Sequence, residues 1–252
     1  MKSDQHPDGL VNKALATIRR ESLLAAGDIV LVALSGGADS MALLHPLLLL
    51  KEPLGLTGVE AVHVHHGLRG EEADRDEEFV RAACRRLSVP LVVMHTDVRE
   101  QAAKAGEGLE ETGRRIRYAY FARLAEEKGA VVATAHTLSD NMETILLHLT
   151  RGCGLRGLCG IPAKRPLLSG EEEAENVRVI RPLIGCSRRE IEEFCRNRQI
   201  GFVTDSTNRE EEYARNRVRL QVIPELEKLN PALPAAFARM IKRVRQDAAY
   251  LE

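Results

Sequence analysis

The stretch that decides the fold is VLVALSGGADSMALL, from Val30 to Leu44. An apolar run stops at paired glycines and restarts as a helical pattern, which predicts a strand, a tight turn and a helix. Glycines let the backbone approach a bulky ligand closely, and the amides at a helix N-terminus favour an anion. The turn lacks the lysine of a Walker A loop and is shorter than that motif. We therefore expect a phosphate cradle in which Asp39 brings in a metal ion.

The composition is that of an ordinary globular protein: 252 residues, 44% of them hydrophobic and 29% charged, with a formal net charge of −1. A chain of this length can bury the core of one α/β domain, with or without an appendage. No apolar run approaches the roughly 20 residues that span a bilayer. Five cysteines without a C-x-x-C pair are typical of the reducing cytosol. We expect a cytoplasmic protein with no membrane partner.

Strand-like and helix-like segments alternate as far as Thr150. Strands are expected at 28–34, 58–67, 90–98 and 130–136, and helices at 11–25, 39–50, 71–87, 107–128 and 139–150. This alternation predicts an α/β fold with a parallel twisted sheet and helices on both faces. Ligands of such sheets bind beyond the carboxyl ends of the strands. Three motif-like segments fall there: SGGADS, HVHHGLRG and TAHTLSDN.

The amino-acid composition changes after Thr150. Residues 151–176 are rich in glycine, proline and charge, which predicts a long loop with an acidic tip. A last strand is expected at 177–184, and a helix at Ser187–Arg198 with Ser187 as N-cap and Glu190 completing a capping box. Its arginines and glutamates at i,i+4 spacing predict a solvated face. A further helix is expected at 231–252.

The motif S-G-G-x-D-S resembles the PP-loop of ATP pyrophosphatases, which cleave ATP between the α and β phosphates. Four further segments resemble those of tRNA(Ile)-lysidine synthases, in that family's order, and the matches run from about Val30 to Asn230. These segments are HVHHGLRGEEADRDEEFV (63–80), RRIRYAYF (114–121), TAHTLSDNMETILLHLTRGCGLRGLCGI (134–161) and the stretch from Arg181 to Leu226.

The resemblance implies an N-type ATP pyrophosphatase fold, which is Rossmann-like, over residues 1–185. A helical subdomain or linker is expected over 186–252, and the family's C-terminal tRNA-binding domains are not expected in this chain. The implied reaction joins L-lysine to C2 of the wobble cytidine of a tRNA(Ile) with a CAU anticodon. ATP adenylates the cytidine, lysine displaces AMP, and Mg²⁺ is the implied metal ion.

The resemblance also assigns the ATP site. The backbone amides and hydroxyls of the PP-loop would hold the phosphates, and Asp39 would bind Mg²⁺, which often takes only one or two carboxylates. The residues assigned to ATP are Ser35, Gly36, Gly37, Ala38, Asp39, Ser40, His63 and Arg114. A zinc site at His63, His65 and His66 is disfavoured, because no acidic partner for these imidazoles is evident.

Lysine recognition is assigned to Asp140 and Glu143, which are three residues apart and share a helix face. A lysine ε-ammonium has a pKa of about 10.4 and must lose a proton before it attacks, so Asp140 is the expected proton acceptor. His136 is the third catalytic candidate, beside Asp39 and Asp140. The alternatives are that both carboxylates only stabilise a helix N-terminus and that His136 only packs.

The remaining assignments concern nucleic acid, because the guanidinium fork suits phosphate. The residues predicted to contact tRNA or phosphate are Arg117, Arg215, Asn216 and Arg219. Asp205 and Asn208 are expected to shape the turn before that last helix.

Two other functions stay open. The family's H-H-x-D-D-Q is replaced here by His136-Thr137-Leu138-Ser139-Asp140-Asn141, which favours a non-catalytic ATP- or tRNA-binding module. A PP-loop tRNA 2-thiolation enzyme is the second alternative, and the missing C-x-x-C pair argues against it. The sequence leaves open whether the protein forms a homodimer.

Overall fold

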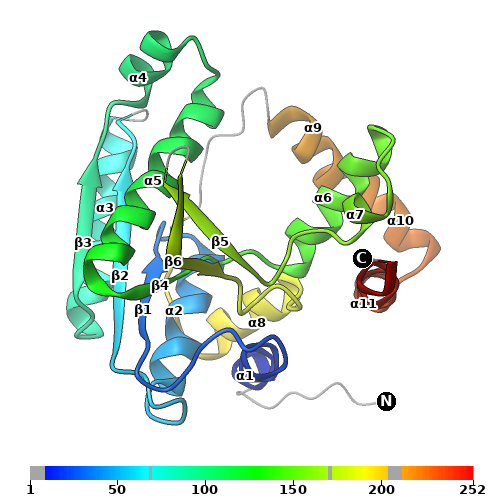
Figure 1. Cartoon of the computed structure of the whole chain (residues 1–252), viewed down its shortest axis with the longest axis horizontal. Helices are drawn as coiled ribbons and strands as arrows, with labels where there is room; N and C mark the ends of the chain where they lie inside the picture. Colours follow the sequence, from blue (N-terminus) through cyan, green and yellow to red (C-terminus); the bar gives the residue numbers. More distant parts are fainter. Residues whose placement is uncertain (1–8, 68–69, 170–171, 204–211, 252) are drawn as a thin grey trace.

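The computed structural model describes residues 9–67, 70–169, 172–203 and 212–251 (Figure 1). Its centre is a six-stranded sheet in the order β3-β2-β1-β4-β6-β5. The strands are β1 (Ile29–Ala33), β2 (Gly58–His65), β3 (Leu91–His95), β4 (Ala130–Ala133), β5 (Lys164–Ser169) and β6 (Glu172–Ile180). Strands β3, β2, β1, β4 and β6 pair in parallel, and β5 pairs antiparallel with β6. The predicted α/β class with a largely parallel sheet is confirmed.

Two local predictions were wrong. Residues 151–176 do not form one long loop, because they contain the short helix α7 (Leu155–Leu158), strand β5 and the start of β6. Leu167 is buried together with Val179 in the core behind the sheet, so this hairpin has an apolar side that the surrounding charges obscured. Residues 96–98 are not strand either. Asp97 caps the helix α4 (Val98–Ala105) by accepting from the Glu100 amide.

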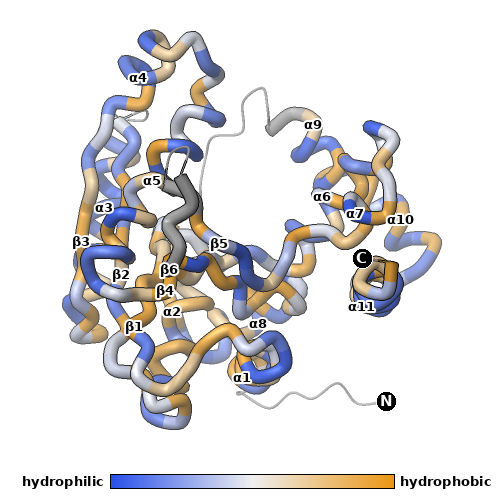
Figure 2. The backbone as a smooth tube through the Cα atoms, viewed as in Figure 1, coloured by the Kyte–Doolittle hydropathy of each residue, from blue (hydrophilic) through white to orange (hydrophobic). Residues whose placement is uncertain are grey.

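Helices cover both faces of the sheet. One face carries α1 (Gly9–Arg20), α2 (Ala38–Leu50), α3 (Glu71–Arg86) and α8 (Arg188–Asn197), and the other carries α5 (Leu109–Lys128). Strand β1 serves both cores, because Val30 and Val32 face the first and Leu31 faces the second. Figure 2 shows the hydrophobic residues concentrated along β1, β4 and α2.

The predicted capping box of α8 is present, since Ser187 and Glu190 bond to each other's backbone. The exposed face of this helix carries the predicted i,i+4 pairs Arg188–Glu192 and Arg189–Glu193. Its other face, with Ile191 and Phe194, is part of the main core. The division at residues 185 and 186 stays a prediction.

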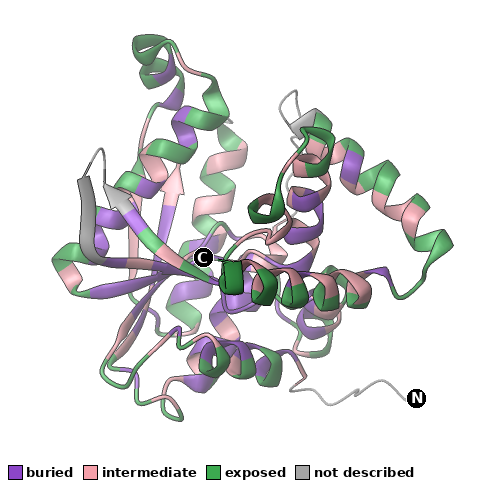
Figure 3. Cartoon of the chain, turned by 45° about the vertical axis from the view of Figure 1, so that its right-hand side comes forward, coloured by how far each residue is buried: buried purple, intermediate pink, exposed green. Residues whose placement is uncertain are grey.

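The C-terminal helices form a separate lobe, set apart from the sheet in Figure 1. Helix α6 (Leu138–Thr150) leaves the sheet, and Met142 and Ile145 pack against Leu233 and Ile241 of α11 (Leu233–Leu251). The lobe also contains α9 (Glu212–Arg217), a π-helical turn (Val218–Val222) and α10 (Ile223–Leu229). Figure 3 shows that much of the surface of α11 is exposed or half-buried. None of the helices within the described ranges is both long and apolar enough to cross a bilayer.

Candidate active site

The predicted strand, tight turn and helix are present as β1, the turn that follows it, and α2. The Ser40 hydroxyl lies 3.1 Å from the Ser35 hydroxyl and donates to the Gly37 carbonyl at 2.9 Å. Gly37 is the N-cap of α2 and contributes no side-chain cap. The amides of Ala38 and Asp39, in the first turn, have no acceptor within the helix. This helix start is therefore available to an anion, as PP-loop chemistry requires.

Gly36 fixes the path of the turn. Its φ is +90°, and a Cβ atom there would lie 3.0 Å from Val203 Cγ2 and 3.2 Å from Val80 Cγ2. The Val203 amide donates to the Gly36 carbonyl at 3.0 Å. Val203 was not predicted, and no sequence pattern marks it. Asp205 and Asn208, predicted to shape the turn that follows, lie outside the described residues.

A cavity of about 490 Å³ opens at the carboxyl ends of the strands. It is walled by β1, β2, α5 and the turns after β1 and β4, and the segment before residue 204 contributes Val203. The predicted site residues that line it are Ser35, Gly37, Asp39, Ser40, His63, Arg117, His136 and Asp140. The other predicted site residues are not among its lining residues: Gly36, Ala38, Arg114, Glu143, Arg215, Asn216 and Arg219.

His63 is held in one tautomer. Its Nδ1 lies 2.8 Å from the Leu34 carbonyl oxygen, and because a carbonyl can only accept, Nδ1 carries the proton. Burial lowers the pKa of His63, so the ring is neutral near pH 7. His63 thus presents a neutral imidazole to the cavity. No three His, Cys, Asp or Glu side chains of the described residues come together as metal ligands.

His136 is also neutral. Burial and the nearby Arg181 guanidinium lower the pKa of His136 to about 4. Its Nδ1 lies 3.0 Å from the Thr134 hydroxyl. At neutral pH such a ring is a weak base, and it suits hydrogen bonding to a substrate better than proton storage.

The tertiary structure brings Asp39 of α2 and Asp140 of α6 to the same cavity. Burial raises the pKa of Asp39, and the Asp140 carboxylate raises it further. Within the described residues the Asp39 carboxylate accepts no hydrogen bond from a side chain or backbone amide. Arg188 and Arg219 oppose this rise in pKa. A carboxylate that lines the cavity without a hydrogen-bond donor of its own fits Mg²⁺, which binds oxygen ligands and keeps several waters.

Asp140 completes a capping box and also lines the cavity. Its Oδ2 accepts from the Thr137 amide at 2.7 Å and from the Thr137 hydroxyl at 2.8 Å, which completes a capping box on α6. The alternative that Asp140 stabilises a helix N-terminus is therefore confirmed for one of its carboxylate oxygens. Asp140 also lines the cavity, so its functional interpretation stays a prediction.

Glu143 is 2% exposed and is held by two arginines that the sequence analysis assigned to phosphate. Arg215 Nε donates to Glu143 Oε2 at 3.0 Å, and Arg219 Nε lies 3.6 Å from Oε1. Burial and Asp140 raise the pKa of Glu143, and the two arginines oppose that shift. Asn216, between them in sequence, is half-buried on α9.

The three departures from the family pattern all have structural partners. Thr137 caps α6, and the Ser139 hydroxyl accepts from the Arg188 amide at 3.3 Å. Asn141 is 2% exposed, and its Oδ1 accepts from the Ile161 amide at 2.7 Å. These substitutions hold α6 against its neighbours and leave His136 and Asp140 at the cavity.

Two arginines near the site were missed. Arg165 lies on β5, and Arg181 directly follows β6. Both interact with Tyr118 of α5, as do the predicted Arg114 and Arg117. A signal existed for Arg181, because it opens the RPLI segment at the end of a buried strand. Arg165 had none, since its strand was predicted as a loop.

Comparisons with known proteins agree with this geometry. A PP-loop domain family matches residues 11–226. The tRNA(Ile)-lysidine synthase of Dehalococcoides mccartyi is 39% identical over 245 residues, which are 96% of this chain and 51% of that protein. That of Porphyromonas gingivalis is 41% identical over 243 residues, with 96% and 50% covered. The chain thus spans about half the length of the curated relatives it matches.

Among solved structures, the U34-tRNA thiolase of Methanococcus maripaludis, solved with its 4Fe-4S cluster, superimposes with a TM-score of 0.68. The match covers 94% of this chain and 79% of that one, at 17% identity, and shows the shared fold alone. The family match covers most of the chain, including the turn from Ser35 to Ser40. The chain therefore belongs to the PP-loop domain family.

Proposed function

We propose that this chain catalyses the ATP-dependent ligation of L-lysine to C2 of the wobble cytidine of a CAU-anticodon tRNA(Ile). The observation that carries the proposal is the meeting of Asp39 and Asp140 beside an uncapped PP-loop, in one cavity. The PP-loop with Asp39 would bind ATP, and the Asp140 carboxylate would bind the cationic amine of lysine. The similarity to tRNA(Ile)-lysidine synthases along 96% of the chain supports the same assignment.

In the first step the cytidine O2 attacks the α-phosphorus of ATP, and the bond to pyrophosphate breaks. The amides at the start of α2 and the hydroxyls of Ser35 and Ser40 hold the departing phosphates. Mg²⁺ bound at Asp39 would spread the negative charge that develops there. His63 stays neutral and is available to the nucleoside part of ATP.

In the second step the lysine ε-amine attacks C2, and AMP leaves with the bonding electrons. The Oδ1 atom of Asp140 is the candidate proton acceptor, because Oδ2 is used by the capping box. His136, neutral and beside Asp140, can hydrogen-bond the base. Glu143 takes part if the lysine ammonium joins or displaces Arg215 on its carboxylate.

The proposal also includes contacts with tRNA, an oligomeric state and a location in the cell. Contacts of Arg117, Arg215, Asn216 and Arg219 with tRNA phosphates, a homodimer and a cytoplasmic location all remain predictions. All five cysteines are free thiols, which suits a reducing compartment. The curated relatives that match along most of the chain are tRNA(Ile)-lysidine synthases, so a thiolation chemistry is not favoured.

The test is an incubation of unmodified CAU-anticodon tRNA(Ile) with the protein, ATP, Mg²⁺ and lysine, followed by nucleoside mass spectrometry and AMP measurement. Lysidine that forms only with both ATP and lysine supports the proposal. AMP without lysidine would support the adenylation step and contradict lysine capture. If neither product forms while the RNA is bound, the non-catalytic alternative holds. Asp39→Asn is the matched inactive control.

A further inference from the structure

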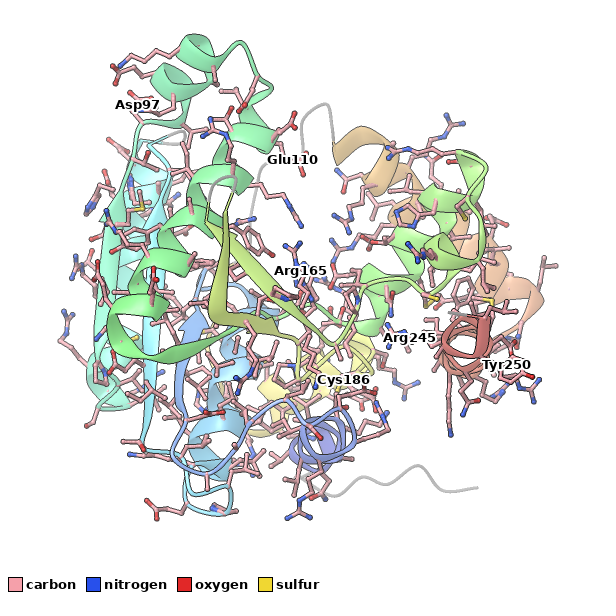
Figure 4. All side chains as sticks on the ribbon, viewed as in Figure 1. Asp97, Glu110, Arg165, Cys186, Arg245 and Tyr250 are labelled. Carbon is pink, nitrogen blue, oxygen red and sulfur yellow. The ribbon has the colours of Figure 1, made fainter. Side chains whose placement is uncertain are left out.

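Four arginines gather around Tyr118, which is buried in α5. The guanidinium carbons of Arg114, Arg117 and Arg165 lie 5.0, 5.9 and 5.3 Å from the centre of its ring. Arg181 is electrostatically coupled to Tyr118, Arg165 and Arg114. The four come from three places in the chain: two from α5, one from β5 and one from the residue after β6. Figure 4 shows Arg165 on the side of β5 that faces α6.

This arginine cluster has little counter-charge: Glu110 acts on Arg117 electrostatically but forms no ion pair with it. None of its four members forms an ion pair with a described carboxylate, whereas Arg178 on the neighbouring strand pairs with Asp28 at 2.8 Å. Arg181 is 2% exposed, and its Nη1 donates to the Pro162 carbonyl at 2.7 Å. The Nε atoms of Arg165 and Arg181 are buried without a hydrogen-bond partner among the described residues. Buried donors without an acceptor are costly, so the cluster calls for an anionic acceptor.

The electrostatics point the same way. Burial lowers the pKa of Arg117 and of Arg181, Tyr118 opposes both shifts, and the neighbouring guanidinium groups lower both pKa values further. Arg181 is buried, Arg117 and Arg165 are half-buried, and Arg114 is exposed. Like charges held together with little access to water are relieved by a bound anion. Several guanidinium forks around one point suit the tetrahedral oxygens of phosphate.

The position of the cluster separates it from the PP-loop. Arg181 follows β6 and Arg165 lies on β5, which are two and three strands from β1 in the sheet order. At about 4.8 Å per strand, that is roughly 10 to 14 Å from the strand that carries the PP-loop. The cavity residues on β2, including His63 and His65, lie on the opposite side of β1. One end of the site thus suits the nucleotide, and the cluster lies at the other.

We propose that Arg114, Arg117, Arg165 and Arg181 form a phosphate-binding subsite that takes an RNA backbone phosphate next to the base in the cavity. Arg117 and Tyr118 line that cavity, so the subsite continues directly from it. The inference rests on the proposed function in that its substrate is RNA. It gives Arg114 an RNA phosphate as ligand in place of the predicted ATP phosphate, and both ligands are covered by the test.

The test compares Arg165→Gln with Arg123→Gln. Arg123 also stacks on a tyrosine of α5, with its guanidinium 5.3 Å from the Tyr120 ring, but it is exposed and lies near Glu127. The probes are a CAU-anticodon stem-loop RNA, titrated between about 50 and 200 mM salt, and ATP with Mg²⁺. Thermal unfolding of each variant checks that it is folded.

Arg165→Gln should weaken RNA binding about tenfold at the lowest salt and flatten the dependence of log Kd on log salt by about 0.7 to 0.9, which corresponds to one phosphate contact. Arg123→Gln should change neither, and ATP affinity should be unaffected in both. Arg165→Lys keeps the charge without the fork, so it should retain the salt slope and recover part of the affinity.

Three results would overturn the subsite. A loss of ATP affinity with normal RNA binding in Arg165→Gln assigns the phosphate to ATP. Normal affinity for both ligands shows that the cluster binds neither, and an equal loss in Arg123→Gln shows a general charge effect. Lysidine formation by the wild-type protein is measured separately. If it is absent while Arg165→Gln still loses RNA affinity, the proposed function fails and the subsite stands.

Discussion

Arg215 Nε lies 3.0 Å from Glu143 Oε2, and this ion pair joins α9 of the C-terminal lobe to α6. Arg215 also donates to the Thr144 hydroxyl at 3.1 Å. Glu143 is 2% exposed, so Arg215 and Arg219, rather than water, stabilise its negative charge. A residue predicted to bind lysine and two predicted to bind phosphate therefore form ion pairs with one another in this structure. We therefore predict that lysine binding at Glu143 would be coupled to the placement of the C-terminal helices.

Replacing Arg215 by glutamine should destabilise the fold by about 1–3 kcal/mol, because it leaves a buried carboxylate with one distant partner. Urea denaturation measures the change. The matched control is Arg217→Gln, since Arg217 lies on the same helix and is exposed, and it should stay within about 0.5 kcal/mol of wild type. Equal effects of the two substitutions would show that the pair with Glu143 contributes nothing.

Gly36→Ala should reduce both stability and ATP affinity. The new methyl group would lie 3.0 Å from Val203 and would sit on a backbone with φ of +90°, a combination that costs about 1–3 kcal/mol. Gly37→Ala is the control for stability. The φ of Gly37 is −71°, and its Cβ would meet only the Ser35 hydroxyl, at 3.5 Å. Denaturant midpoints of the two variants decide the matter, and a Gly37→Ala protein as unstable as Gly36→Ala would contradict this account of the turn.

Asp39→Asn should abolish lysidine formation and yet stabilise the free protein near pH 7. Because burial and Asp140 raise the pKa of Asp39 above 3.8, the folded protein binds its proton more tightly than the unfolded chain does. That contribution is present in acid and is lost as the pH rises through the folded-state pKa. The neutral asparagine does not lose this stability as the pH rises. Asp39→Asn should therefore be more stable than wild type at pH 7 and equally stable near pH 3.

Melting temperatures of wild type and Asp39→Asn at both pH values, without Mg²⁺, measure this difference. Asp74→Asn is the control, because Asp74 is largely exposed, and it should shift stability by no more than about 0.5 kcal/mol at either pH. An Asp39→Asn protein that is less stable than wild type at pH 7 would mean that the Asp39 carboxylate is stabilised by a partner.

His136 should remain neutral down to a pH of about 4, because burial and Arg181 lower its pKa to about 4. The unfolded chain takes up this proton at about pH 6.5, so the contribution of His136 to stability is lost as the pH falls through that value toward 4. An NMR titration of the imidazole, assigned with His136→Gln, gives the midpoint. A midpoint near 6.5 would contradict the burial, and it would restore His136 as a general base at neutral pH.

The PP-loop, the α/β class and the cap of α8 could all be predicted from short windows of sequence. In each case the signal is local: an apolar run followed by paired glycines, strands alternating with helices, or Ser187 three residues before Glu190. The sequence also named Asp39, His63, His136 and Asp140, which line one cavity. The hairpin of β5 and β6 was missed because glycine, proline and charge dominate that window although Leu167 and Val179 are buried.

Tertiary structure decided which of these side chains meet. Glu143 and Arg215 are 72 residues apart in sequence, and Arg165 reaches Tyr118 only because a hairpin returns along the sheet. No local pattern encodes such pairs, since they depend on how whole elements pack. Protonation follows the same rule. The pKa shifts of Asp39 and His136 arise from burial and from charges on other elements, so the residue types were set by the sequence and their chemistry by the environment that folding builds around them.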